Sequence, residues 1–143
     1  MAIYLLGVGS TALKVTYNAV DLTDHVKSVT INMDYDDVDI TAMNATSHAH
    51  MPGLRDDSIE IEFYQDFASS SVHSTINSYL GSASGATLIV QSNGGTVSST
   101  WPKFTLLSSP MSYQPISGSV GDASMTTVTF LPAASSSITV GTS

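Results

Sequence analysis

One stretch of strict alternation, residues 58–64 (SIEIEFY), constrains the fold of this chain more than any other feature. Successive side chains of a β-strand point to opposite faces, so a period of two predicts a strand with one dry face and one wet, acidic face. Pro52-Gly53 lies just upstream and supplies turn chemistry from which such a strand can start. The predicted core positions of this strand are Ile59, Ile61 and Phe63, and its wet positions include Glu60 and Glu62.

The composition extends this β character to the rest of the chain. Only 11% of the 143 residues are charged, and Ser, Thr and Gly are abundant instead. This favours strands and turns over exposed helices, whose surfaces are usually built from Glu, Lys and Arg. A chain of this length usually forms one domain, and the absence of cysteine means that packing and backbone pairing must stabilise it. We therefore predict a single, mostly β domain over residues 1–143.

The hydrophobic period changes to that of a helix immediately after the acidic strand. Val72, Ile76 and Leu80 recur every four residues within a Ser-rich segment. This spacing predicts one amphipathic helix over about residues 69–80, with a core-facing side formed by those three residues. We expect the helix to start after Asp66 or a serine cap and to end at Gly81.

Further strands are indicated by β-branched and aromatic residues between turn signals. Val128 and Phe130 share one face of the last predicted strand and are also assigned to the core. Asn93-Gly94-Gly95 indicates a hairpin. The ends are expected to form an N-terminal arm (1–11) and a C-terminal tail (132–143) that frays or pairs with a neighbour. Besides the acidic strand, the predicted strands are residues 12–20, 26–33, 87–91, 97–107, 111–116 and 123–131.

Residues 34–55 show little periodicity and are predicted to form a long loop. Loops of this length are often functional or become ordered on a partner. Several of its apolar residues have no predicted helix or strand in which to be buried, which indicates a contact surface. The candidate contact residues are Asp34, Asp36, Asp37, Asp39, Ile40, Met43, His48, His50, Met51, Leu54 and Arg55.

The charge balance argues against tight binding to nucleic acid. Twelve acidic and four basic residues give a formal net charge of −8, the opposite of the basic surface that phosphate binding needs. An acidic wall can nevertheless be useful beside DNA, because it repels phosphates and prevents adhesion. The apolar opening MAIYLLGVGS has no preceding basic residue, and no stretch approaches a membrane span, so we expect a soluble protein without membrane insertion.

Catalytic and metal-binding patterns are weak. His48 and His50 would share a strand face, and His25, His73 or the aspartates could complete a metal site, but polar loop histidines are the favoured interpretation. The aspartates at 34–39 could hold a cation, yet an EF-hand is excluded because its glycine and glutamate positions are not met, so solvated or lumen-facing acids are favoured. No Gly-x-Ser-x-Gly elbow or P-loop lysine occurs. We predict no enzyme activity and no cofactor.

Four segments together resemble the major tail tube proteins of long, non-contractile-tailed (siphovirus) bacteriophages. The most specific parts are the Pro-Gly-Leu corner that leads into the alternating strand and Asp-Phe, and the closing PxSGSVGD turn that leads into a Thr-rich strand. Asn44 departs from the glycine expected after the TAM segment. The segments are DLTDHVKSVTI (21–31), TAM (41–43), PGLRDDSIEIEFYQDF (52–67) and QPISGSVGDASMTTVTF (114–130).

The resemblance implies a β-sandwich or barrel-like core with one flanking helix, a long loop and terminal arms. It also implies hexameric rings that stack into a tube around a tape-measure protein, meet terminator and distal tail proteins, and later conduct DNA without binding it specifically. Glu60 and Glu62 would then be candidate lumen-facing acids, and residues 34–55 candidate ring-to-ring contacts. The implied location is the virion tail, after assembly in the host cytoplasm. The alternatives are a capsid decoration protein, a tail terminator or, less favoured, a carbohydrate-binding module.

Overall fold

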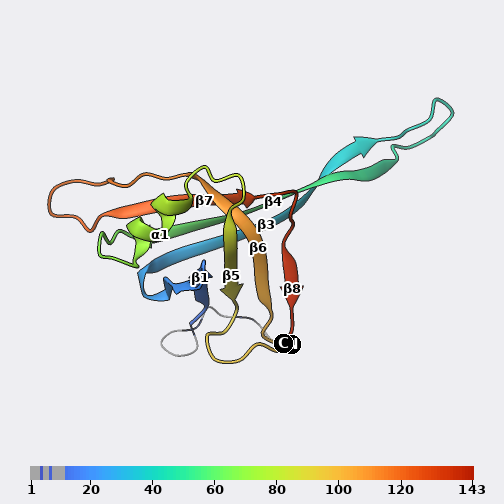
Figure 1. Ribbon diagram of the computed structural model, residues 1–143. Helices are drawn as coiled ribbons and strands as arrows, with labels where there is room; N and C mark the ends of the chain where they lie inside the picture. Colours follow the sequence, from blue (N-terminus) through green and yellow to red (C-terminus); the bar gives the residue numbers. More distant parts are fainter. Residues whose placement is uncertain (1–3, 5–6, 8–11) are drawn as a thin grey trace.

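The computed structural model describes Tyr4, Gly7 and residues 12–143, so most of the predicted N-terminal arm (1–11) lies outside the described residues. The prediction of a mostly β chain with one helix is confirmed (Figure 1). The strands and helices are β1 (Lys14–Tyr17), β2 (Val20–Asp21), a 3-10 turn (Thr23–His25), β3 (Val26–Asp39), β4 (His50–Tyr64), α1 (Val72–Tyr79), β5 (Ala86–Gln91), β6 (Lys103–Ser112), β7 (Met125–Pro132) and β8 (Thr139–Gly141).

All strands belong to one antiparallel sheet that folds over itself. The strand order is β2-β1-β5-β6-β7-β4-β3, with β8 paired to β6 outside this path. The first part of β6 pairs with β5 and its last part pairs with β7, so β6 passes from one layer to the other. Figure 1 shows β1, β5, β6 and β8 running across the direction of β3, β4 and β7. The two layers therefore enclose a core in the manner of a sandwich or half-barrel.

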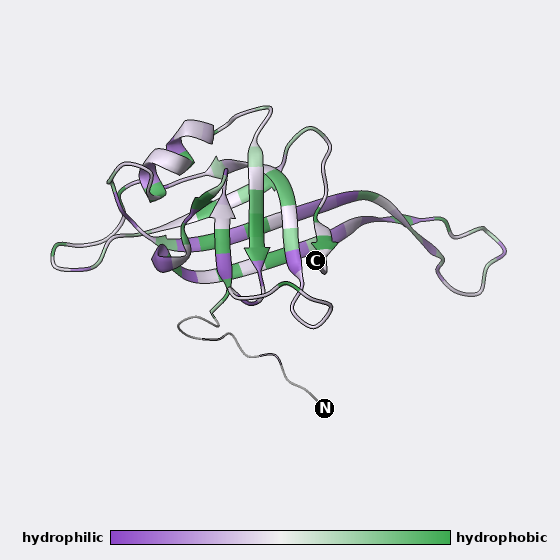
Figure 2. Ribbon diagram, turned by 60° about the horizontal axis from the view of Figure 1, so that its bottom comes forward, coloured by the Kyte–Doolittle hydropathy of each residue, from purple (hydrophilic) through white to green (hydrophobic). Residues whose placement is uncertain are grey.

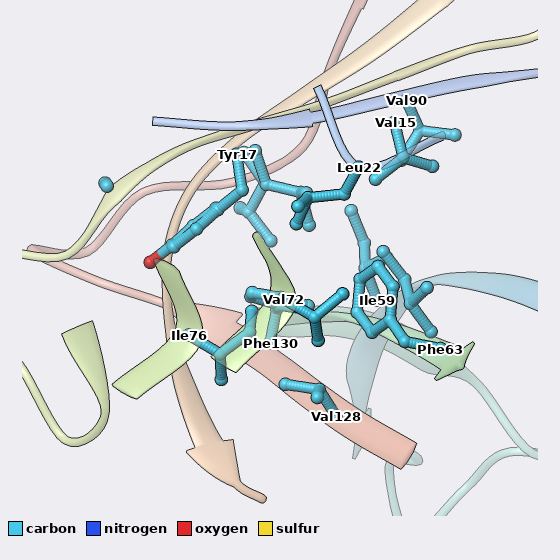
Figure 3. Packing of buried hydrophobic residues seen from close by; sticks show 14 of the residues in the cluster. Val15, Tyr17, Leu22, Ile59, Phe63, Val72, Ile76, Val90, Val128 and Phe130 are labelled. Carbon is cyan, nitrogen blue, oxygen red and sulfur yellow. The ribbon is translucent and has the colours of Figure 1, made fainter. Parts of the chain in front are cut away.

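The core lies between these layers and includes the residues on the predicted apolar face of β4. Ile59, Ile61 and Phe63 are fully buried, as are Val128 and Phe130 of β7 (Figure 3). Val15 and Tyr17 of β1 and Leu88 of β5 close the core from the opposite layer. The Tyr17 hydroxyl donates a hydrogen bond of 2.9 Å to the carbonyl of Ser108, and burial raises the pKa of Tyr17 to about 12.

Helix α1 is shorter than predicted, and this changes the position of Leu80. Val72 and Ile76 are fully buried, but Leu80 is 44% exposed. The assignment of Leu80 to the core is therefore wrong. The physical reason is that the helix ends at Tyr79 and Leu80 has an extended ψ of 118°, which takes it off the i+4 face. At the other end Ser71 precedes the helix, and its N–H donates to Ser74 Oγ at 3.0 Å.

The predicted long loop at residues 34–55 is wrong, because most of it is a β-hairpin. β3 and β4 are paired all the way from Val26↔Phe63 to Asp39↔His50, and only two bulges shift the register. Only residues 40–49 connect them. Sequence periodicity did not show this because both faces of the paired segment are exposed, so no alternation between apolar and polar residues is needed. We call residues 34–55 the hairpin arm.

Four further strand predictions need correction. The predicted strand at residues 12–20 is divided by a tight turn at Asn18 and Ala19, which both have positive φ. The strand predicted at residues 26–33 continues past Met33 and ends at Asp39. Residues 92–102 form a longer connection instead of a tight hairpin at Asn93-Gly94-Gly95, so β6 starts only at Lys103. β6 runs to Ser112, and residues 113–124 are a loop where part of a separate strand was expected.

The C-terminal segment is held on the sheet. Within the predicted tail (132–143), β8 pairs with Lys103–Thr105 of the same chain. Ile138 is almost completely buried and belongs to the core cluster. Its backbone N–H donates a 2.7 Å hydrogen bond to the carboxylate of Asp57 on β4. This segment thus covers one end of the core within the chain itself.

Candidate assembly interface

The outer face of β3, β4 and β7 is a polar surface. Across the β3–β4 pair, Ser28 lies opposite Glu62 and Thr30 lies opposite Glu60. Across the β4–β7 pair, Glu60 lies opposite Thr129. These side chains point away from the core because they alternate with the buried residues of the same strands. The face therefore presents hydroxyls and carboxylates on a paired backbone, and includes both predicted lumen-facing acids, Glu60 and Glu62.

Two further acids extend this face to the base of the hairpin arm. Asp34 and Asp56 are exposed and directly opposite each other in the β3–β4 register. Like charges at such a position repel each other, so the pair is not explained by sheet stability. At the end of this face that lies farthest from the hairpin arm, Lys27 Nζ lies 3.7 Å from Glu62 Oε1. Four carboxylates and one ammonium group thus make the face net acidic.

The hairpin arm projects beyond the two layers (Figures 1 and 2). Met43 and Leu54 are 106% and 80% exposed, and Ile40 and Met51 are each half exposed. Figure 2 shows hydrophobic and hydrophilic residues interspersed along it. All predicted contact residues except Arg55 are exposed in the chain by itself. An apolar surface of this kind on a projecting element is typical of a contact region.

The tip of the arm is ordered by local hydrogen bonds. Asp39 accepts hydrogen bonds from the hydroxyl and the backbone N–H of Thr41, and these lower the pKa of Asp39. The Thr41 hydroxyl in turn accepts a 2.9 Å bond from the N–H of Ala49, across the loop. His50 Nδ1 lies 2.8 Å from Asp37 Oδ1 and His48 Nδ1 3.5 Å from Asp39 Oδ2. The two histidines therefore face separate aspartates.

An ion pair at the root of the arm ties it to the C-terminal segment. Arg55 Nε lies 2.8 Å from Asp57 Oδ2 and 3.0 Å from Oδ1, and the Asp57 side chain is fully buried. Arg55 Nη2 also donates to the carbonyl of Ile138 at 3.1 Å. The hydrogen bond to Asp57 raises the pKa of Arg55, whose guanidinium lies 5.7 Å from the centre of the Tyr35 ring. Arg55 was predicted as an exposed contact and instead serves this internal junction.

A second junction connects the far end of β4 with α1. His25 Nε2 lies 3.0 Å from Asp66 Oδ2, which also accepts a 2.7 Å hydrogen bond from Ser71 Oγ at the helix start. Hydrogen bonds from the Ala68 N–H, the Ser71 hydroxyl and His25 lower the pKa of Asp66. Next to it, His73 Nδ1 lies 2.8 Å from the Tyr113 hydroxyl. The histidines that could have completed a metal site thus stabilise the joint around the helix.

β3 forms an edge of the sheet. It is the last strand in the order and pairs only with β4 among the strands that the structure describes. Its 14 residues make it an unusually long edge, and exposed edges of this kind favour pairing with another chain. A small apolar depression of about 200 Å³, lined by Val29, Ile31, Val90 and Phe104 among others, lies beside it between the two layers.

Other kinds of site find no support in the part of the chain that the structure describes. Tyr4, Gly7 and residues 12–143 contain no group of three or more His, Cys, Asp or Glu side chains placed to hold a metal ion. Among the same residues, no helix has the length and hydropathy to cross a bilayer.

Two residues of the arm root were missed by sequence reasoning. Asp57 was not assigned to the core, although it falls on the Ile59 face by strict alternation. The alternation was the available signal, but burial of an acidic side chain is costly and is not predicted unless a compensating partner is known. One partner, Arg55, lies only two residues away in the same strand, but the other, Ile138, lies 81 residues away and no local pattern indicates it.

The sequence matches no protein-family model and no curated protein. Solved structures do share its fold. One is the SPP1 tail tube, with a TM-score of 0.72 and 10% identity over 95% of this chain and 79% of that one. Another belongs to the virion of a native gene transfer agent particle, with a TM-score of 0.68 and 14% identity over 89% and 95% of the two chains.

A third similar structure comes from the sheath/tube terminator of an extracellular contractile injection system. Its TM-score is 0.67, with 14% identity over 94% of this chain and 96% of that chain. These proteins are components of tails, tubes and virions, and none is described as an enzyme. The fold occurs in a contractile system too, so it does not by itself indicate a non-contractile tail. The chain has the fold of tail tube proteins.

Proposed function

We propose that this protein is a structural tail tube subunit that assembles with copies of itself into stacked rings around a central channel. The observation that carries this proposal is the tail tube fold combined with the long edge of β3, which pairs with no strand other than β4 among Tyr4, Gly7 and residues 12–143. Neighbouring subunits would pair their sheet edges and close the polar sheets into one inner barrel. Closure would remove the exposed edges that make an isolated sheet prone to aggregation.

The polar face of β3, β4 and β7 suits the wall of a channel for DNA. Asp34, Asp56, Glu60 and Glu62 lie on it, and Lys27 pairs with one of these four carboxylates. Fixed carboxylates repel phosphates, so DNA would pass without adhering. In this role the protein has no catalytic step, and its function depends on shape, pairing and charge.

The finer features of the proposal follow from the resemblance to siphovirus tail tubes. We propose rings of six subunits, a tape-measure protein in the lumen during assembly, and contacts with terminator and distal tail proteins at the tube ends. The chain would assemble in the host cytoplasm and reside in the virion tail. The hairpin arm would make contacts between successive rings.

Electron microscopy of the purified protein tests this proposal. We expect tubes or stacked rings with a central channel, and six-fold symmetry in end-on views. A variant with proline at Thr30 and Asn32 on β3 should form no rings, because proline disrupts pairing along the edge, and circular dichroism of the variant checks that its fold is kept. Monomers that never assemble at high concentration, with every sheet edge covered within the chain, would contradict the proposal.

A tube terminator is the second candidate function. Two solved structures with this fold are a sheath/tube terminator and a tube-terminating cap, with TM-scores of 0.67 and 0.65. A terminator would form single rings that bind the end of a tube without growing. Electron micrographs of the protein alone distinguish the two, because a tube subunit makes particles of variable length and a terminator makes rings of one height.

A further inference from the structure

The Asn93-Gly94 step, just beyond the end of β5, is a chemically labile point that the proposed function does not use. Of the asparagines in the chain, Asn93 alone precedes a glycine. Asparagine is a thermolabile residue, because the next backbone nitrogen can attack its side-chain amide. Glycine at the next position makes this attack easiest, since it has no Cβ to obstruct the ring that forms. The step lies in the connection 92–102 between β5 and β6 (Figure 1).

The reaction open to this step is loss of ammonia followed by addition of water. The Gly94 nitrogen, once it has given its proton to a base, forms a bond to Asn93 Cγ, and the Cγ–Nδ2 bond breaks. The amide group takes a proton from water and leaves as ammonia, and a five-membered succinimide ring remains. Water then opens the ring at either carbonyl. One opening leaves aspartate and the other leaves isoaspartate, in which the backbone runs through Cγ, so both products add one negative charge.

Both reacting groups are engaged in hydrogen bonds in the folded chain. The Gly94 N–H donates to the Ala12 carbonyl at 2.8 Å, so the nitrogen that must lose its proton is held by a partner. Asn93 Oδ1 accepts a 2.8 Å hydrogen bond from the Gly95 N–H, which commits the side chain to a different backbone amide. Each of these hydrogen bonds must open before Cγ and the Gly94 nitrogen can react, and this slows the reaction.

Tyr4 adds a second attachment beside this step. Its hydroxyl donates a 2.8 Å hydrogen bond to the Ser92 carbonyl, and its ring centroid lies 5.9 Å from that of Trp101 near the other end of the connection. The Ala12 contact lies just beyond the last residue pair of β1 with β5. We call Tyr4 and Ala12, with their contacts to this connection, the N-terminal clasp. Contacts of this kind, near a chain end and on a loop, open locally at a much lower free-energy cost than the core.

From these observations we propose that Asn93-Gly94 is a site of spontaneous deamidation whose rate is set by opening of the N-terminal clasp. While the clasp is closed, the Gly94 nitrogen stays bonded to Ala12 and the step is protected. Each local opening exposes the step to base and water, so modified chains accumulate slowly with time. Isoaspartate lengthens the backbone at this point, which moves the Gly94 N–H away from Ala12 and weakens the clasp. The modification thus converts a reversible opening into a permanent one.

A second Asn-Gly step in the same molecule provides the matched control. Ser117→Asn creates it in the exposed loop 113–124, where, among the residues that the structure describes, nothing lies within 4 Å of a Cβ built on Gly118. The variant is incubated unassembled at mildly alkaline pH, and peptide mapping by mass spectrometry follows conversion of both steps to aspartate and isoaspartate. In the folded chain we expect conversion at Asn93 to be at least about tenfold slower than at the introduced step, whereas in concentrated urea the two rates should agree within about twofold.

Loosening the clasp gives a second measurement in the same background. Tyr4→Ala removes both the hydroxyl and the ring, and should raise the rate at Asn93 at least about threefold without changing the rate at the introduced step. Tyr64→Ala, at an exposed position on β4, is the control and should change neither rate. Gly94→Ala should nearly abolish conversion at Asn93, because a Cβ obstructs ring closure.

The rates at Asn93 in the folded chain decide the inference. Equal rates at the two Asn-Gly steps would show that the fold does not protect Asn93. A rate that is the same with and without Tyr4→Ala would show that the clasp does not control the step, and an absence of conversion would show that the step never opens. Each of these results overturns the inference, and none of them bears on the tube function, because the chains are unassembled.

Discussion

At the scale of single residues, the junction of Asp57 with Arg55 and Ile138 is the most informative feature. An acid on the buried face of a strand is costly unless charge and hydrogen bonds compensate for it. Arg55 supplies the charge, and the Ile138 N–H supplies a hydrogen bond. Breaking such a pair from one side leaves the other group without its partner, which costs more than the pair contributes.

The first prediction therefore concerns Asp57. Asp57→Asn should lower the free energy of unfolding by about 2–4 kcal/mol, because it leaves a partly buried guanidinium unpaired. Asp56→Asn is the matched control, since Asp56 is exposed on the opposite face and should change stability by less than about 0.5 kcal/mol. Urea denaturation of the unassembled chain measures both. Equal stability of the two variants would show that the junction does not stabilise the fold.

The second prediction concerns the acid dependence of the joint at α1. The folded-state pKa of Asp66 is lowered, so its contribution to stability is present above its unfolded value near about 4 and is lost as pH falls through the folded value. Wild type should therefore be more stable than Asp66→Asn at neutral pH, and the difference should shrink below about pH 4. Thermal unfolding across this range tests it, and a pH-independent difference would contradict it.

At the scale of elements, the hairpin arm shows why strand pairing is harder to predict than strand existence. The alternation of apolar and acidic residues over 58–64 was sufficient to predict this part of β4, its core residues and the acids on its outer face. The same strand continues to His50, but there both faces are exposed and the pattern disappears. Cross-strand hydrogen bonds to β3 hold this part together, and such pairing is a property of two segments instead of one.

The third prediction is that the arm can be shortened without loss of the fold. Replacing residues 38–51 by Asn-Gly joins Asp37 to Pro52, which are already partners, through a two-residue turn. The variant retains Arg55 and should unfold as cooperatively as wild type, but should form single rings in place of stacks. Circular dichroism and electron microscopy measure the two effects.

The control deletes all of residues 34–55. This removes Arg55 and leaves Asp57 buried without its cation, so this deletion should be clearly less stable than the shorter one. Full-length tubes from the shortened variant would show that the arm is not needed for stacking.

At the scale of the whole molecule, net charge and exposed apolar ends act in opposite directions. Each copy carries −8, so copies repel each other, while burial of the exposed apolar side chains of the hairpin arm and of the loop 113–124 would favour contact in an assembly. Added salt screens the repulsion and leaves apolar burial intact.

The fourth prediction follows from this balance. Assembly should become faster as NaCl rises from about 50 mM to about 500 mM, since the Debye length falls well below the distance between neighbouring subunits. Light scattering after concentration or temperature jumps measures the rate. Slower assembly at high salt would indicate that ion pairs, and not apolar contacts, dominate the interface.

The sequence by itself determined the mostly β class, the dry and acidic faces of β4, the amphipathic start of α1 and the acidity of the chain, because these depend on the order of neighbouring side chains. Only the tertiary structure decided that residues 34–55 are a hairpin, that Leu80 is exposed, and that Asp57 is buried beneath Ile138. These depend on which distant segments meet. The Ile138 N–H that hydrogen-bonds Asp57, for example, lies 81 residues away and leaves no trace in the local pattern.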